Sequence, residues 1–279
     1  MEDKLVASIE RVAAALERMA PPAALPPDFR GARLFRHDPI GRAFAPAPDY
    51  GLALDLLVGI DRQKALVVEA FTRFAAGVAT NHILLWGVRG AGKSSLVKAA
   101  FMTVAARAEA LKLVEVDRDE VAAMPDLFEA LRGFGERFVV LCDDLSFEEG
   151  AAAAKALKSA LEGGVSGPPE NVLFVATSNR RHLMPRDHAE ARGAIAMAED
   201  AEEEVSVSDR FGLWIGFPPM EQSAYLDAVR AYAERFGLDT PGLEDRALRW
   251  AKLRGARSGR VAWQFTRDLA GELGKALPV

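Results

Sequence analysis

HILLWGVRGAGKSS, residues 82–95, is the stretch that decides the fold. It joins a short apolar strand to the pattern G-x4-G-K-S, whose glycines let the backbone curl and point successive N–H groups at a phosphate. Because a strand precedes the pattern and a helix follows it, a P-loop is favoured over a glycine-rich turn that only caps a helix. The residues predicted to bind nucleotide are Gly87, Val88, Arg89, Gly90, Ala91, Gly92, Lys93, Ser94 and Ser95. Lys93 is expected to neutralise β- and γ-phosphate charge, and the Ser94 hydroxyl to bind Mg²⁺.

Two aspartates follow another apolar strand. Residues 138–142 read FVVLC and run directly into Asp143 and Asp144. An acid at this position of a P-loop protein holds the metal, so Asp143 is predicted to bind Mg²⁺ and Asp144 to activate water. The alternative, a turn that caps a helix, is disfavoured by the nearby P-loop.

A third polar strand end is Thr177-Ser178-Asn179, after the apolar residues 171–176. In a parallel sheet it lies at the same carboxyl edge as Asp143, where ligands bind. Asn179 is therefore a candidate contact for the attacking water or the γ-phosphate. A simple Asx turn explains Asn179 equally well at this point.

Strands and helices alternate outward from these motifs. Apolar strands at 82–86, 113–116, 138–142, 171–176 and 213–217 alternate with helical patterns, which predicts an α/β fold with a parallel sheet covered on both faces. After Pro218-Pro219 three helical patterns remain. We therefore predict a nucleotide-binding domain over 51–218 and a small helical domain over 219–279.

The N-terminal fifty residues read differently. Residues 1–20 predict an amphipathic helix with apolar residues at alternating spacings of four and three, interpreted as a helix docked on its own domain rather than as a coiled coil. Pro21-Pro22 ends it, and residues 21–50 have no clear period, which suggests a linker or extended arm.

Composition narrows the class of protein. The chain has 279 residues, a net charge of −5 and a single cysteine, Cys142, so no internal disulfide can form and a reducing cytoplasm is expected. No apolar run reaches the ~20 residues of a membrane span, and Met1-Glu2-Asp3-Lys4 does not begin a signal peptide. The patterns by which GTPases read guanine are absent, so ATP is the expected nucleotide.

Two arginines are candidate phosphate contacts. Arg210 precedes the fifth strand, and Arg260 opens the last helix. An arginine finger accelerates phosphoryl transfer by about 10³–10⁵, but most arginines are surface residues in weak ion pairs. The sequence alone leaves both interpretations open.

Together these motifs resemble the AAA+ superfamily of P-loop ATPases over residues 51–275, and more narrowly a bacterial AAA+ ATP-binding family of unknown function. The resemblance implies a five-stranded parallel sheet in the order 5-1-4-3-2 with a C-terminal helical lid. It assigns Asn179 as sensor 1, Arg210 as the finger and Arg260 as sensor 2. It also places Gly59 and Ile60 along the adenine cleft. Many AAA+ motors have Glu at the position of Asp144, so slow hydrolysis is expected.

The function expected is an ATPase that uses MgATP to change the conformation of an unknown protein client. A finger that acts on a neighbour requires a homo-oligomer. One alternative is a DNA-binding, helicase-loader-like ATPase, for which Lys155, Lys158, Arg180 and Arg181 are candidate contacts, although the acidic run 199–204 would repel DNA. Another is a scaffold that binds ATP and hardly hydrolyses it.

Overall fold

The computed structural model describes residues 27–38, 43–49, 51–145, 151–163, 167–179, 207–238 and 240–277. The helix predicted for residues 1–20, the pair Arg180-Arg181 and the acidic run 199–204 lie outside these ranges. Within them, no helix combines the length and the apolar character that crossing a bilayer requires.

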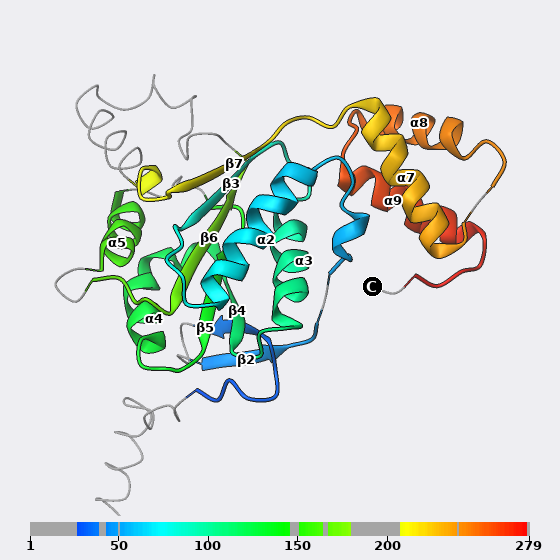
Figure 1. Cartoon of the computed structure of the whole chain (residues 1–279). Helices are drawn as coiled ribbons and strands as arrows, with labels where there is room; N and C mark the ends of the chain where they lie inside the picture. Colours follow the sequence, from blue (N-terminus) through cyan, green and yellow to red (C-terminus); the bar gives the residue numbers. More distant parts are fainter. Residues whose placement is uncertain are drawn as a thin grey trace, which may run out of the picture.

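A sheet between two layers of helices is joined to a separate group of three helices (Figure 1). The strands are β1 (Leu34–Asp38), β2 (Ala43–Ala47), β3 (Ile83–Gly87), β4 (Leu111–Val116), β5 (Arg137–Cys142), β6 (Val172–Ser178) and β7 (Leu213–Phe217). The helices are α2 (Asp61–Ala75), α3 (Lys93–Ala105), α4 (Met124–Leu131), α5 (Ala151–Glu162), α7 (Gln222–Phe236), α8 (Leu243–Arg254) and α9 (Gly259–Glu272). Two 3-10 turns, η1 (Leu54–Leu56) and η2 (Arg118–Ala123), complete the described elements.

The central strands are apolar throughout because both faces of the sheet are buried. Neighbouring residues of β3 point to opposite sides: Leu84 packs in the core with α4 and α5, whereas Ile83 and Leu85 pack with α2 and α3. Each apolar residue added to such a strand therefore contributes to one of two cores, at about 25 cal/mol per Å² removed from water. The α/β class and the parallel character predicted from the sequence are confirmed.

The predicted number of strands is wrong, and the order of the complete sheet differs accordingly. Seven strands lie in the order β2-β1-β4-β5-β6-β3-β7. The five expected strands are contiguous within it, and β1 and β2 extend the sheet beyond β4. β1 pairs parallel with β4 and antiparallel with β2.

Residues 34–47, which we expected in a linker or extended arm, thus include two strands of the sheet. The sequence lacks an alternating hydrophobic pattern that would predict these strands. In particular, β2 is an edge strand that exposes most of its residues and contains Pro46. Tertiary contacts hold this region instead. Phe29 is 2% exposed, and its ring makes edge contacts with Phe35, Phe134 and Phe138 at centroid distances of 5.1, 5.1 and 4.6 Å.

The three C-terminal helices share a hydrophobic core of their own, and we call these helices the lid. Tyr225 of α7, Ala247 of α8 and Phe265 of α9 are buried in it. Leu56, from η1 in the segment that we assigned to the α/β domain, also packs in this core. The lid is therefore connected to the α/β domain both by the chain after β7 and by the apolar contact of η1.

Candidate functional site

The register of the sheet brings the predicted motifs to one edge. β3 pairs with β6 so that Trp86 lies opposite Ser178, and β5 pairs with β6 so that Cys142 lies opposite Ala176. All three strands are parallel, so their carboxyl ends meet. The P-loop, the aspartate pair and the 177–179 segment consequently converge in space, although about ninety residues separate the P-loop from Asn179 in sequence.

The P-loop bends sharply where it leaves β3. Gly87 has φ +137°, and a Cβ there would lie 2.1 Å from the carbonyl oxygen of Phe217 on β7. Any side chain would push β7 away from β3, so glycine is required by space as well as by backbone angle. Gly92 is left-handed at φ +91° and immediately precedes α3. The loop thus ends with the N-terminus of α3 directed at its hollow.

Lys93 folds back over the loop. Its ammonium donates hydrogen bonds to the carbonyl oxygens of Gly87 (2.9 Å) and Val88 (3.0 Å) and to Oδ1 of Asn179 (3.0 Å). Burial lowers the pKa of Lys93, while the carboxylates of Asp143 and Asp144 oppose that shift. These contacts hold the Lys93 ammonium, with its three N–H donors, at the P-loop, where it would attract negative phosphate oxygens.

Asp143 is oriented by two hydroxyl groups. Ser94 Oγ, on the first turn of α3, and Thr177 Oγ1, at the end of β6, both donate hydrogen bonds to Asp143 Oδ1. The described residues contain no cluster of three or more His, Cys, Asp or Glu side chains that could hold a metal. Mg²⁺ in phosphate-binding sites uses one or two carboxylates together with waters and substrate oxygens, so a Ser–Asp pair fits this ion.

Asp144 occupies an unusual backbone conformation. Its φ of 57° makes it the one non-glycine residue with a positive φ in the described part of the chain. Its N–H donates to Thr177 Oγ1 at 3.0 Å, and its Oδ1 accepts a hydrogen bond from Asn179 Nδ2. Left-handed backbone away from glycine is costly and clusters at functional sites, although Asp tolerates it better than most residues. Here Thr177 holds the backbone N–H of Asp144, and Asn179 holds its carboxylate at the cavity wall.

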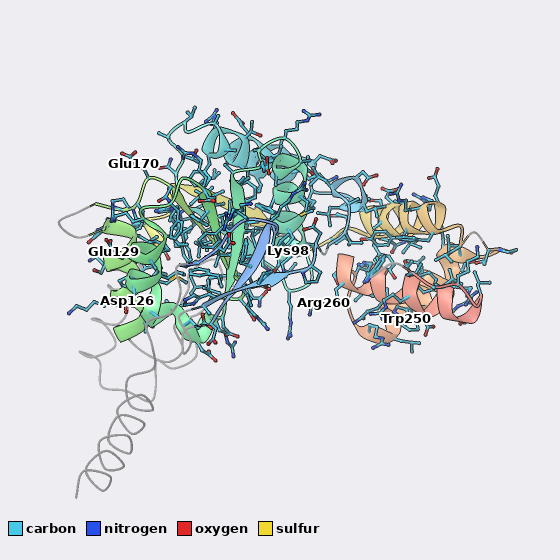
Figure 2. The ribbon with its side chains drawn as sticks, turned by 90° about the horizontal axis from the view of Figure 1, so that it is seen from below. Lys98, Asp126, Glu129, Glu170, Trp250 and Arg260 are labelled. Atoms are coloured by element: carbon cyan, nitrogen blue, oxygen red, sulfur yellow. The ribbon has the colours of Figure 1, made fainter. Side chains whose placement is uncertain are left out.

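The lid closes the site from the other side. The N–H of Arg260, at the start of α9, donates to the carbonyl oxygen of Gly90 at 3.2 Å. A Cβ on Gly90 would lie 3.0 Å from Ser258 Oγ and 3.2 Å from Arg260 Cβ, so the missing side chain allows this approach. Figure 2 shows Arg260 on the side of the lid that faces the α/β domain, whereas Trp250 lies farther out in the lid.

A cavity of about 290 Å³ lies between the two domains. Its polar end is lined by predicted residues, namely Arg89, Gly90, Gly92, Lys93, Ser94, Ser95, Asp143, Asp144, Asn179 and Arg260. Its other lining residues include Leu52, Leu57, Tyr232 and Trp263, which give it an apolar end. Burial raises the pKa of Tyr232 to about 12, so its hydroxyl stays neutral there.

Several predicted residues do not line this cavity. Arg210 is bound instead by the carboxylate of Glu162 on α5. Gly59 packs under the lid, since a Cβ there would lie 3.1 Å from Ala224 Cβ of α7. Ile60 is buried behind the P-loop, with Cδ1 3.9 Å from the place of a Cβ on Gly92. The P-loop residues Gly87, Val88 and Ala91 shape the loop from outside the cavity.

The sequence analysis missed the roles of Thr177, Tyr232 and Trp263. Thr177 is 1% exposed and contacts both aspartates, a role suggested only by its place at the polar end of a strand. Tyr232 and Trp263 come from α7 and α9 and meet edge to face at 5.4 Å. The sequence predicted only that they lie in helices, and nothing local indicates that these helices bring them to the cavity that the P-loop lines.

The chain matches a known protein family over most of its length. The family model described as "Protein of unknown function (DUF815)" matches residues 31–273. The chain belongs to the DUF815 family. The search of curated proteins gave no match. The family description assigns no substrate to this DUF815 chain.

Solved structures identify the fold of the DUF815 chain as that of AAA+ P-loop ATPases. Orc1 of Aeropyrum pernix in complex with DNA matches with a TM-score of 0.58 and 16% identity over 82% of this chain and 65% of that one. RuvB of Thermotoga maritima (P216G mutant) matches with a TM-score of 0.54 and 18% identity, over 80% of this chain and 67% of the RuvB chain. A chain of the HORMA:CdnC:Trip13 complex of Escherichia coli MS115-1 matches with a TM-score of 0.50 and 14% identity, over 77% of this chain and 90% of that chain. The chain spans 65% of the Orc1 chain, and these likenesses concern the fold alone.

Proposed function

We propose that this chain is an AAA+ ATPase that binds MgATP between its α/β domain and its lid and hydrolyses it to drive a conformational change in a protein client. The observation that carries the proposal is the pair of linked contacts in one cavity: Ser94 and Thr177 on Asp143, and Lys93 and Asn179 beside Asp144. A helix cap or an Asx turn requires none of these contacts.

The phosphate end of the site is assigned to residues that the cavity already brings together. The P-loop N–H groups and Lys93 bind the phosphates, and Ser94 with Asp143 binds Mg²⁺. Mg²⁺ bound there neutralises charge that develops on the phosphate oxygens. Lys93 exchanges its hydrogen bond to Asn179 for one to a phosphate oxygen, which frees Asn179 to contact the attacking water.

The chemical step is assigned to Asp144. Its carboxylate accepts a proton from the attacking water, and Asn179 orients both partners through the hydrogen bond that it already donates to Asp144. Asp is one methylene shorter than Glu, about 1.5 Å less reach. We therefore expect slow turnover, which suits a conformational switch.

The apolar end of the cavity is assigned to the adenine base. Leu52, Leu57 and Trp263 line it, and an aromatic ring offers a stacking surface for a purine. These residues replace Gly59 and Ile60 as the expected base contacts. Arg260 comes from the same helix as Trp263, so base binding and phosphate binding both engage α9.

Arg210 is proposed to act on the nucleotide of a neighbouring copy, which makes the active form a homo-oligomer. Its ion pair with Glu162 joins side chains that are 40% and 43% exposed, and such pairs contribute about 0–1 kcal/mol. That small energy does not prevent Arg210 from exchanging partners. Arg210 is not among the residues that line the cavity of its own chain, which fits a role in trans.

The test is the steady-state ATPase rate as a function of protein concentration, with and without single-stranded DNA at low and high salt. We expect a specific rate that rises with concentration, disappears in Asp144→Ala and does not respond to DNA. A rate near zero despite tight ATP binding would support the scaffold alternative. DNA stimulation that is lost at high salt would support the loader alternative.

A further inference from the structure

A second hollow lies on the outer side of the P-loop. It encloses about 700 Å³ between the P-loop, the chain that follows β7, and the end of α8 with the turn into α9. Val88, Met220 and Leu248 supply apolar lining, and Arg89, Lys252 and Arg257 supply three cations. We call these six residues the basic groove. None of the residues that line this hollow carries a carboxylate.

The cations of the basic groove are available to a partner. Arg89, Lys252 and Arg257 are exposed, and none of them forms an ion pair with another described residue. The polar contact recorded for Arg257 is a long hydrogen bond of 3.4 Å from Nη1 to Gln222 Oε1. Three unpaired cations beside an apolar wall favour an occupant with several carboxylates and some apolar side chains. The apolar wall makes a bare phosphate backbone a poorer fit.

The chain itself contains a segment of that chemistry. Residues 195–205 read IAMAEDAEEEV and include five carboxylates between Ile195, Met197 and Val205. The segment lies outside the described residues, so only its sequence enters the argument. Its acidic residues lie six to eleven positions before Arg210. They are therefore within ~20–40 Å of that arginine for any path of the chain.

We propose that residues 195–205 of one copy dock in the basic groove of a second copy. This rests on the proposed function, because an Arg210 that reaches a neighbour's nucleotide brings its own acidic segment to that neighbour's P-loop. The basic groove adjoins the nucleotide cavity there, and Arg89 lines both. Attraction between the acidic segment and the groove then selects this neighbour and sets the orientation of Arg210.

Docking in this groove also couples assembly to the lid. Val88 and Arg89 belong to the α/β domain, whereas Lys252 and Arg257 belong to the lid. An occupant that contacts both sides holds the lid in place over the P-loop. We therefore expect assembly and ATP affinity to strengthen one another.

The first experiment measures fluorescence anisotropy of a labelled peptide with the sequence of residues 194–206, titrated with the full-length chain. The Lys252→Glu, Arg257→Glu double variant is expected to weaken binding about tenfold or more, because two attractions become repulsions. Arg249→Glu is the matched control. It reverses an exposed charge on the same helix outside the groove, and we expect a change below about twofold. A peptide with Gln in place of its acids is expected to bind at least about tenfold more weakly.

The second experiment measures association of the full-length chain by sedimentation with ATP. Glu202→Lys, Glu203→Lys, Glu204→Lys is expected to dissociate the oligomer, and combining it with Lys252→Glu, Arg257→Glu in one chain is expected to restore association. Equal peptide affinity of the wild type and the double groove variant would overturn the proposal, as would displacement of the peptide by DNA alone. The proposed function and the docking can fail separately. If peptide binding and association change as expected while Arg210→Ala keeps wild-type turnover, the role of Arg210 in trans is refuted and the docking of residues 195–205 is retained.

Discussion

Thr177 provides the sharpest test of the site. Its hydroxyl donates to Asp143 and accepts from the N–H of Asp144 at 3.0 Å, and the residue is 1% exposed. Thr177→Val keeps the shape and removes both hydrogen bonds. A hydrogen bond to a charged group contributes about 1.5–3 kcal/mol, and an unsatisfied N–H costs about 1–3 kcal/mol. Because Asp144 is exposed, water can replace part of the lost hydrogen bonding. We expect a loss of about 2 kcal/mol in the free energy of unfolding.

The effect on turnover follows from the same contacts. Without Thr177 Oγ1, Asp143 keeps only the hydrogen bond from Ser94 among those that the described side chains donate to it, and the left-handed turn at Asp144 loses its side-chain acceptor. Misplacement of a catalytic group by about 1 Å can cost 10²-fold, so kcat is expected to fall about 10–100-fold. Urea unfolding and steady-state ATPase assays measure the two effects.

Thr177→Ser is the matched control, since it keeps the hydroxyl and loses one methyl group, worth about 1 kcal/mol. Its kcat is expected to stay within about threefold of the wild type. Wild-type turnover in Thr177→Val, or equal damage in both variants, would refute the assignment of Thr177 as the residue that positions the aspartates.

Three further predictions concern other groups. Lys93→Ala is expected to lose ATP binding in isothermal titration, and an affinity near that of the wild type would contradict the P-loop assignment. Arg210→Ala is expected to bind ATP normally and lose concentration-dependent turnover, which mixing with Asp144→Ala chains restores; no restoration would count against a finger in trans. Burial lowers the pKa of His82 from 6.5 to about 4, and its Nδ1 accepts the N–H of Phe174 at 3.1 Å. As the pH falls, His82 is protonated in the unfolded state before it is protonated in the folded state. Its contribution to the free energy of unfolding is therefore complete above about pH 6.5 and decreases toward pH 4, by about 2 kcal/mol at pH 5. Denaturation of His82→Asn as a function of pH should lose this slope.

Local patterns predicted which residues gather at the polar end of the cavity, because each part of it is encoded by adjacent residues. Glycines at 87, 90 and 92 determine the loop, and Asp143 follows directly from an apolar strand. Once the strands are parallel, their carboxyl ends must meet, so Asn179 could be expected near Lys93, and the structure has their side chains 3.0 Å apart.

The edge of the sheet was beyond local reasoning. β1 and β2 lie at the border, where exposed positions remove the continuous apolar signal that the central strands carry. Their place next to β4 depends on Phe29 and the rings that surround it, which come from segments more than a hundred residues apart. Sequence patterns report burial along one segment, and they do not report which distant segment causes it.

The amino-acid sequence by itself determined the α/β class, the glycine-rich loop between β3 and α3, and the acidic strand end, since these depend on short-range backbone geometry and on continuous apolar strands. Only the tertiary structure decided that the sheet has seven strands. It also decided that Thr177 orients both aspartates and that Trp263 and Arg260 reach the P-loop from the lid. Those contacts join residues far apart in the chain, and their positions follow from how the lid packs on the α/β domain.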